Sequence, residues 1–275
     1  NVALNIQALG ATPVLCSTVG NDTHGELFLK LLKNNNLSTK GIIASKKRIT
    51  TVKTRVIAHN QQLLRVDEET ENNLDNKDCD LLFEKIASII HKEKINVIVF
   101  EDYDKGTITP ELIEATIILA KRKKIPVAVD PKKKNFNNYK GATLFKPNLK
   151  ELKEGTKSDI GLADIQGIKK IVGNLKSDYH YEMVLLTLSD KGVLIYNNSI
   201  QKLIPAHIRQ IADVSGAGDT VISVAALCLA SGCSPETMAS LANLAGGLVC
   251  EQVGVVPIDR ELLIKESLKL TTSLI

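Results

Sequence analysis

The chain has 275 residues, of which 44% are hydrophobic and 24% charged, a balance that excludes a disordered tail and a fibrous repeat. Its net charge of +4 is too small to predict a nucleic acid or an anionic membrane as the main partner. No run of about 18 apolar residues occurs, as a membrane helix would need, and no signal peptide opens the chain. We therefore expect a cytoplasmic protein.

Cysteine and histidine are scattered along the chain. The five cysteines never occur as C-x-x-C, and the five histidines are equally dispersed, so neither a disulfide framework nor a zinc site is predicted. Any metal is expected to be a hard cation bound by oxygen atoms.

Apolar patterns of helical and strand period alternate along the chain. In the first half we expect a helix that ends at Gly10, a strand at 14–19, helices at 26–32, 79–91 and 110–124, and strands at 96–100 and 127–130. In the second half we expect strands at 143–145, 183–188, 193–196 and 200–204, a short helix after Pro147, and helices at 163–175, 218–230 and 235–250. This alternation predicts an α/β fold with a mostly parallel sheet covered by helices on both faces.

The stretch 50–67 has a different period. Residues such as Val52, Thr54 and Val56 alternate with Lys53 and Arg55, and a polar pair at 60–61 separates this run from a second one. This pattern predicts a β-hairpin outside the main sheet.

The segment Asp213-Val-Ser-Gly216-Ala217-Gly218-Asp219-Thr220 opens an apolar helix. Glycines let backbone amides turn toward a ligand, and a helix N-terminus adds free donors and a positive dipole end, so the segment predicts an anion site. A carboxylate beside a bound anion suggests a base that works next to a phosphate. The alternative is a plain glycine turn in which Asp219 only favours the helix dipole.

Two further segments follow predicted strands. Asn148 and Glu151 lie one helical turn apart after Lys146-Pro147, an arrangement that suits a hydrated Mg²⁺ ion but equally a helix capping box. Hydroxyls and a glycine at Thr187, Ser189 and Gly192 suit a nucleotide phosphate or an ordinary hairpin turn.

The order N-x-x-E, T-L-S-x-x-G and D-x-[ST]-G-A-G-D-T resembles that of the ribokinase-like, or PfkB, carbohydrate kinases, and V-G-N-D-T-H-G at 19–25 is similar to a further segment of that family. The resemblance covers nearly the whole chain. It implies a single ribokinase-like domain over 1–275 with a small β-hairpin lid at about 50–67 and a first strand that precedes Asn1. It also implies catalysis by Asp219 with the backbone amides of Gly216, Ala217 and Gly218.

The same resemblance implies ATP as phosphoryl donor. The residues that it places around the nucleotide are Lys146, Asn148, Glu151, Thr187, Ser189, Gly192 and Asn243. It implies Mg²⁺ held through water by Asn148 and Glu151, and a monovalent cation, with K⁺ as the candidate, at Asp213.

Several stretches, above all N-Q-Q-L-x-R-x-D at 60–67, are similar to one subgroup, the D-glycero-β-D-manno-heptose 7-phosphate kinases. This implies phosphorylation of the anomeric hydroxyl to the 1,7-bisphosphate in ADP-heptose and lipopolysaccharide core synthesis. A sugar that already carries a phosphate needs a cationic clamp, which the planar fork of arginine suits. The candidate sugar-binding residues are Asn1, Arg55, Gln61, Arg65, Asp67, Lys105 and Lys132.

Two alternatives stay open. One is a PfkB-type kinase of another sugar or sugar phosphate, such as fructose, tagatose or ribose, and the other is a non-catalytic sensor of sugar phosphate or nucleotide. Glu101 stands where the heptose subgroup has serine. No H-x-G-H motif occurs, so we expect a separate nucleotidyltransferase downstream. Because an isolated two-stranded ribbon is marginal in water, we also expect a homodimer formed lid to lid.

Overall fold

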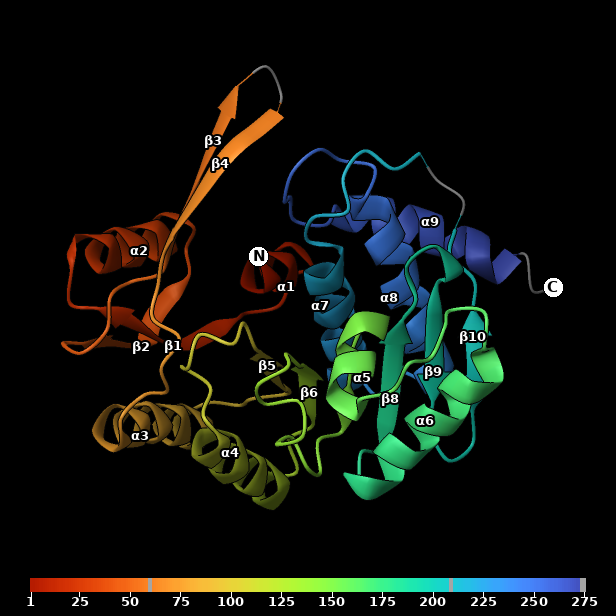
Figure 1. Cartoon of the computed structure of the whole chain (residues 1–275), viewed down its shortest axis with the longest axis horizontal. Coiled ribbons are helices and arrows are strands. Elements are labelled where there is room, and N and C mark those ends of the chain that lie inside the picture. Colours follow the sequence, from red (N-terminus) through yellow and green to blue (C-terminus); the bar gives the residue numbers. More distant parts are fainter. Residues whose placement is uncertain (59–60, 208–209, 273–275) are drawn as a thin grey trace. The chain divides into compact units, whose positions relative to one another are not determined.

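The computed structural model describes residues 1–58, 61–207 and 210–272 (Figure 1). The chain forms two compact units. The larger unit contains residues 1–12, 95–103 and 117–275, and the smaller unit contains residues 13–94 and 104–116.

A six-stranded sheet forms the centre of the larger unit, with strand order β10-β9-β8-β7-β6-β5. Strands β5 to β8 run parallel, and β9 and β10 continue the sheet antiparallel. The strands are β5 Ile98–Glu101, β6 Val127–Asp130, β7 Leu144–Phe145, β8 Met183–Thr187, β9 Val193–Tyr196 and β10 Gln201–Ile204. The mostly parallel sheet of an α/β fold is confirmed.

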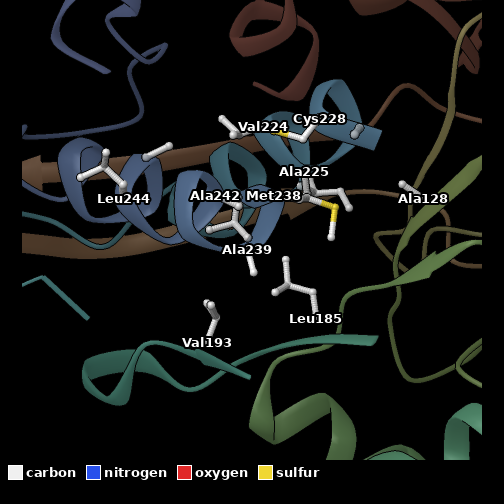
Figure 2. Packing of buried hydrophobic residues seen from close by; sticks show 14 of the residues in the cluster. Ala128, Leu185, Val193, Val224, Ala225, Cys228, Met238, Ala239, Ala242 and Leu244 are labelled. Carbon is white, nitrogen blue, oxygen red and sulfur yellow. The ribbon is translucent and has the colours of Figure 1, made fainter. Parts of the chain in front are cut away.

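Both faces of this sheet are buried. On one face, Ala128 and Leu185 pack with α7 and α8 in one apolar cluster (Figure 2), to which Leu144 also belongs. The next residues along the strands, such as Val129 and Phe145, point to the opposite face and are fully buried as well. The helices of this unit are α1 Val2–Ala8, α5 Leu149–Thr156, α6 Ile165–Asp178, α7 Ala217–Ala230, α8 Pro235–Val249 and α9 Arg260–Thr272, with a 3₁₀ turn, η1, at Ser189–Lys191.

The smaller unit contains a parallel pair of strands and an antiparallel hairpin. Its elements are β1 Val14–Gly20, α2 Thr23–Asn34, β2 Ser38–Ser45, β3 Val52–Ala58, β4 Gln61–Glu68 and α3 Asn76–Lys92. Helix α4 Pro110–Lys123 begins in this unit and ends in the larger one. The hairpin β3–β4, predicted at 50–67, projects from the rest of the smaller unit (Figure 1), and its role as a lid stays a prediction.

Most predicted elements occur within a few residues of the expected ranges, because caps and glycines mark their ends. Asp22, Asp75, Asp164 and Ser234 each accept a backbone hydrogen bond at a helix start. The sequence analysis did not predict β2 and α9. No helix in the described ranges is both long and apolar enough to cross a bilayer.

Candidate active site

The glycine-rich segment forms a turn that opens α7. Gly216 is the N-cap residue with φ of 82°, and a Cβ atom at this position would come 2.9 Å from Nδ2 of Asn1. The predicted glycine turn before an apolar helix is confirmed, with the helix beginning at Ala217, one residue earlier than expected. The anion-binding role of the Gly216, Ala217 and Gly218 amides stays a prediction.

Asp219 lies in the first turn of α7, and the amide of Asn1 donates a 2.8 Å hydrogen bond to its Oδ2 atom. Asn5 connects α1 to α7, because its Nδ2 atom donates to Thr220 Oγ1 at 3.1 Å. Its Oδ1 atom accepts the backbone N–H of Ile258, in the segment before α9, at 2.8 Å. Asn5 is fully buried. The sequence analysis missed it, although a buried amide within an apolar helical pattern is the signal that would have indicated a structural polar contact.

Two more carboxylates lie close to Asp219. Glu101 ends β5 and Asp130 ends β6, and the two residues are direct partners in the parallel register. One carboxylate oxygen from each of Glu101, Asp130 and Asp219 lies within 4.8 Å of the others. Burial, and then the charges of Asp130 and Asp219, raise the pKa of Glu101 to about 8.

Two lysines compensate this negative charge. Lys146, whose side chain is 2% exposed, places Nζ 2.9 Å from Asp130 Oδ2. Lys132 lies 3.6 Å from Asp130 Oδ1 and 2.5 Å from Glu151 Oε1. Burial opposes the charge of Lys132, but Asp130 and Glu151 prevail and hold its pKa above the ordinary value. Lys132, predicted as part of a sugar clamp, thus lies beside the predicted metal-binding glutamate.

Asn148 and Glu151 form the capping box of α5. The Oδ1 atom of Asn148 accepts the backbone N–H of Glu151 at 2.8 Å, and Glu151 Oε2 accepts that of Asn148 at 2.8 Å. The capping-box alternative is therefore confirmed. Each of these oxygens keeps a further lone pair, so the pair still fits a hydrated cation bound through water.

The segment after β8 joins this site through a parallel bridge between Asn148 and Thr187. Ser189 starts η1, and Gly192, with φ of 88°, leads into the antiparallel strand β9, so the hairpin-turn alternative is confirmed. A Cβ atom at Gly192 would lie 2.1 Å from the carbonyl oxygen of Ile204, which explains the glycine. Contact of Thr187, Ser189 and Gly192 with a nucleotide stays a prediction.

Asn243, predicted to contact the nucleotide, and Asp213, predicted to bind a monovalent cation, both make hydrogen bonds that order loops. Asn243, buried on α8, donates from Nδ2 to the carbonyl oxygen of Pro205 at 2.8 Å. Asp213 accepts the backbone N–H of Ser215 at 2.9 Å and that of Gly254 at 3.1 Å, and these bonds lower its pKa. Asp213 therefore ties the loop before α7 to the segment after α8.

The candidate sugar-binding residues of the smaller unit lie on or beside the hairpin. Arg55 and Arg65 are exposed and directly opposite each other in the β3–β4 register. Arg65 Nη2 also lies 2.9 Å from Asp67 Oδ2. Gln61 begins β4, but its side chain lies outside the described part of the molecule.

Lys105 is compensated within the same unit, since its Nζ atom lies 2.6 Å from both Glu69 Oε1 and Glu71 Oε1. The structure therefore brings Arg55 and Arg65 together, whereas Lys105 contacts glutamates and Lys132 belongs to the larger unit.

The V-G-N-D-T-H-G segment fixes the entry to the hairpin. Asp22 Oδ1 accepts the backbone N–H of Gly25 and the hydroxyl of Thr50, both at 2.7 Å, and its Oδ2 accepts the backbone N–H of Thr50 at 2.8 Å. These hydrogen bonds lower the pKa of Asp22. They connect the start of α2 with the residues that lead into β3.

A family model described as pfkB family carbohydrate kinase matches residues 1–260. The chain is 37% identical over 254 residues to the bifunctional protein HldE of Sulfurimonas denitrificans, with 92% of this chain and 52% of that protein covered. It is 38% identical over 263 residues to the bifunctional protein HldE of Campylobacter jejuni subsp. doylei, with 94% and 53% covered. The chain thus spans about half the length of the curated relatives it matches.

Solved structures show the same fold. Phosphofructokinase-2 from Escherichia coli in complex with potassium superposes with a TM-score of 0.83 at 20% identity, covering 98% of this chain and 86% of that chain. Ribokinase from Thermotoga maritima gives a TM-score of 0.67 at 20% identity, with 96% and 85% covered. The predicted ribokinase-like fold is confirmed.

Proposed function

Because this chain belongs to the pfkB family of carbohydrate kinases, we propose that it transfers the γ-phosphoryl group of ATP to the anomeric hydroxyl of D-glycero-β-D-manno-heptose 7-phosphate. The chain is a phosphotransferase that acts on a sugar hydroxyl. The proposal adds the identity of the sugar and the position of transfer, with the 1,7-bisphosphate as product. The observation that carries it is the pair of facing arginines on the hairpin.

Arg55 and Arg65 together form the proposed anion-binding site. Like charges directly opposite each other in an antiparallel pair are unfavourable, and only Arg65 has a carboxylate partner among the described residues, Asp67. A phosphate between the two guanidinium groups would relieve this repulsion and accept forked hydrogen bonds. We assign the 7-phosphate of the sugar to these two arginines.

Asp219 is the proposed base. The amide of Asn1 orients its carboxylate through the 2.8 Å hydrogen bond, so the other oxygen remains available to the attacking hydroxyl. As the sugar oxygen bonds to the γ-phosphorus and the bond from that phosphorus to the leaving oxygen breaks, the hydroxyl proton passes to Asp219. The amides of Gly216, Ala217 and Gly218 then stabilise charge on the transferring group.

Cations complete the site. Asn148 and Glu151 are the residues we propose to hold Mg²⁺ through water, and the ion would neutralise charge on the ATP phosphates. The buried Lys146 adds a fixed positive charge beside Asp130. Asp213 is the proposed ligand for K⁺, since its oxygens keep lone pairs beyond those used by Ser215 and Gly254.

The hairpin is the proposed dimer contact. Val56, Leu64 and Val66 share one face of the ribbon and are 46%, 55% and 45% exposed. An apolar face on a two-stranded ribbon gains stability by packing against a second copy. The bisphosphate product would then need a nucleotidyltransferase, carried by residues outside 1–275 or by another protein.

The test is ADP release against a panel of sugars and sugar phosphates, with fructose, tagatose and ribose derivatives beside heptose 7-phosphate. Activity confined to heptose 7-phosphate is expected. Activity with another sugar would contradict the substrate assignment while keeping the kinase. No ADP release with any sugar would favour a sensor that binds sugar phosphate or nucleotide without turnover.

A further inference from the structure

Glu101 and Asp130 contain two buried acceptor atoms without donors. Among the described residues, the Oε2 atom of Glu101 and the Oδ1 atom of Asp130 are inaccessible to solvent and have no hydrogen-bond partner. Lys132 Nζ, at 3.6 Å from Asp130 Oδ1, lies just beyond hydrogen-bond distance. Both residues belong to the cluster whose carboxylate oxygens lie within 4.8 Å of each other. Two ionised carboxylates can only accept hydrogen bonds, so they cannot satisfy each other, whereas one protonated carboxyl can donate to its neighbour.

The surrounding groups indicate which carboxyl carries such a proton. Asp130 already has two cationic partners, Lys146 at 2.9 Å and Lys132 at 3.6 Å. Asp219 accepts a hydrogen bond from the amide of Asn1. Within the described residues, no lysine or arginine nitrogen forms an ion pair with Glu101, and a proton on Glu101 therefore costs no ion pair.

The remaining titratable neighbour is the phenol of Tyr103. Burial, followed by the charge of Glu101, raises the pKa of Tyr103, so this phenol stays neutral and adds no charge to the cluster. The pKa of Glu101 itself is raised to about 8 by burial and by the two aspartates. The direction of this shift agrees with the two unpartnered oxygens and the closeness of the three carboxylates.

A divalent cation bound between clustered carboxylates would also offset the repulsion between their negative charges. Here two ammonium groups already contact Asp130, and both would repel a dication placed at its oxygens. A proton on one carboxyl lowers the negative charge of the cluster without bringing a dication close to these ammonium groups. The arrangement therefore favours a proton over a metal ion.

We propose that Glu101 is a positioning residue that holds a proton in the resting enzyme and donates it in a hydrogen bond to Asp130, so that Asp219 stays the ionised base. This rests on the proposed function in naming Asp219 as the base. During transfer the hydroxyl proton goes to Asp219, while the proton on Glu101 remains on the protein. Loss of that proton would add a negative charge beside the anionic group being transferred and slow turnover.

Infrared spectroscopy tests the proton without any substrate. In the wild type, the carbonyl stretch of a protonated carboxyl is expected between pH 4.5 and about 8 and should disappear above about pH 8. The Glu101→Gln variant should lack this band. Glu261→Gln, at an exposed position on α9, should keep the band. A wild-type spectrum without the band, or a band that persists in Glu101→Gln, would overturn the proposal. Loss of the band when MgCl₂ alone is added at constant pH would replace the proton by a metal site.

Kinetics supply the second readout. The kcat of the wild type is expected to fall above about pH 8, and Glu101→Gln, which mimics the protonated form, should remove that fall. Glu101→Ala should lose about tenfold or more in kcat, and Gln should rescue most of this loss. An unchanged alkaline limb in Glu101→Gln would contradict the assignment. If no sugar is phosphorylated, the proposed function fails, but the infrared result still decides where the proton lies.

Discussion

The carboxylate cluster of the larger unit and the hairpin of the smaller unit both collect charged side chains, but in opposite surroundings. Asp130 and Lys146 are 5% and 2% exposed and contact each other at 2.9 Å. Arg55 and Arg65 are exposed and face each other with like charge. Buried groups are costly to leave unpaired, whereas exposed ones are free to find a ligand.

This difference suggests that the two regions serve separate functions, with catalysis in the carboxylate cluster and sugar recognition on the hairpin. The proposed chemical step lies where Asp130 is held in the core by Lys146 and Lys132, and fixed charges of this kind provide the preorganisation that phosphoryl transfer needs. The proposed choice of sugar lies on a ribbon where Arg55 faces Arg65 and has no carboxylate partner among the described residues. Substitutions in the two regions are therefore expected to change different quantities.

The largest effect is expected from Asp219→Asn. The variant keeps the shape of the side chain but cannot accept the hydroxyl proton, so kcat should fall by about 10²–10⁴-fold. Nucleotide affinity, measured by calorimetry, should change little. Asp178→Asn, at an exposed position at the end of α6, is the matched control and should retain wild-type kcat. Loss of nucleotide binding in Asp219→Asn would assign Asp219 to binding instead.

Lys146→Met tests how much the buried ion pair with Asp130 contributes to the stability of the fold. Removing the lysine leaves the buried carboxylate of Asp130 without its nearest cation, so the free energy of unfolding should drop by about 3–5 kcal/mol. Lys202→Met breaks the exposed pair with Glu236, whose side chains are 52% and 45% exposed, and should cost about 0–1 kcal/mol. Urea denaturation measures both. Equal losses would mean that burial does not distinguish the two pairs.

Arg55→Ala and Arg65→Ala should act on binding rather than folding. Each variant is expected to raise KM for the sugar phosphate about tenfold, the effect of losing roughly 1.5 kcal/mol of charged hydrogen bonding. The melting temperature should stay close to that of the wild type. Arg122→Ala, exposed on α4, supplies the control for a general loss of positive charge. Unchanged KM in both hairpin variants would remove the clamp.

The smallest change in activity is expected from Leu64→Asp. A charge on the apolar face of the hairpin should prevent its burial against a second copy, and light scattering at micromolar concentration should then give the mass of a monomer. The control is Ile264→Asp on α9, where the native residue is 44% exposed, and this variant should leave the mass unchanged. A wild-type protein that is already monomeric would contradict the lid-to-lid dimer.

Local sequence patterns were sufficient for most of the fold. Strand β6 was predicted with its observed bounds, because the four buried residues of Val127–Asp130 lie between turn signals. Strand β2 was missed because Gly41 interrupts its apolar run, and the reason for that glycine is a long-range contact. A Cβ atom there would lie 2.3 Å from the carbonyl oxygen of Leu15 in β1.

The candidate site divides in the same way. The glycine turn and the Asn148 cap are local motifs, and both were predictable from their spacing. The approach of Glu101 to Asp130 depends on the register of two parallel strands connected through α4, which no local pattern encodes. The ion pair of Lys132 with Glu151 likewise arises only once β6 and α5 are in place.

The central claim is that Asp219 promotes phosphorylation of the anomeric hydroxyl of a sugar already phosphorylated elsewhere. Phosphorus NMR of a reaction with ATP and heptose 7-phosphate tests it directly. The account predicts a new signal from phosphate on the anomeric carbon while the 7-phosphate signal is retained. With Asp219→Asn it predicts no new signal over the same reaction time. A new phosphate at another carbon, or the same product formed at an equal rate by Asp219→Asn, would contradict it.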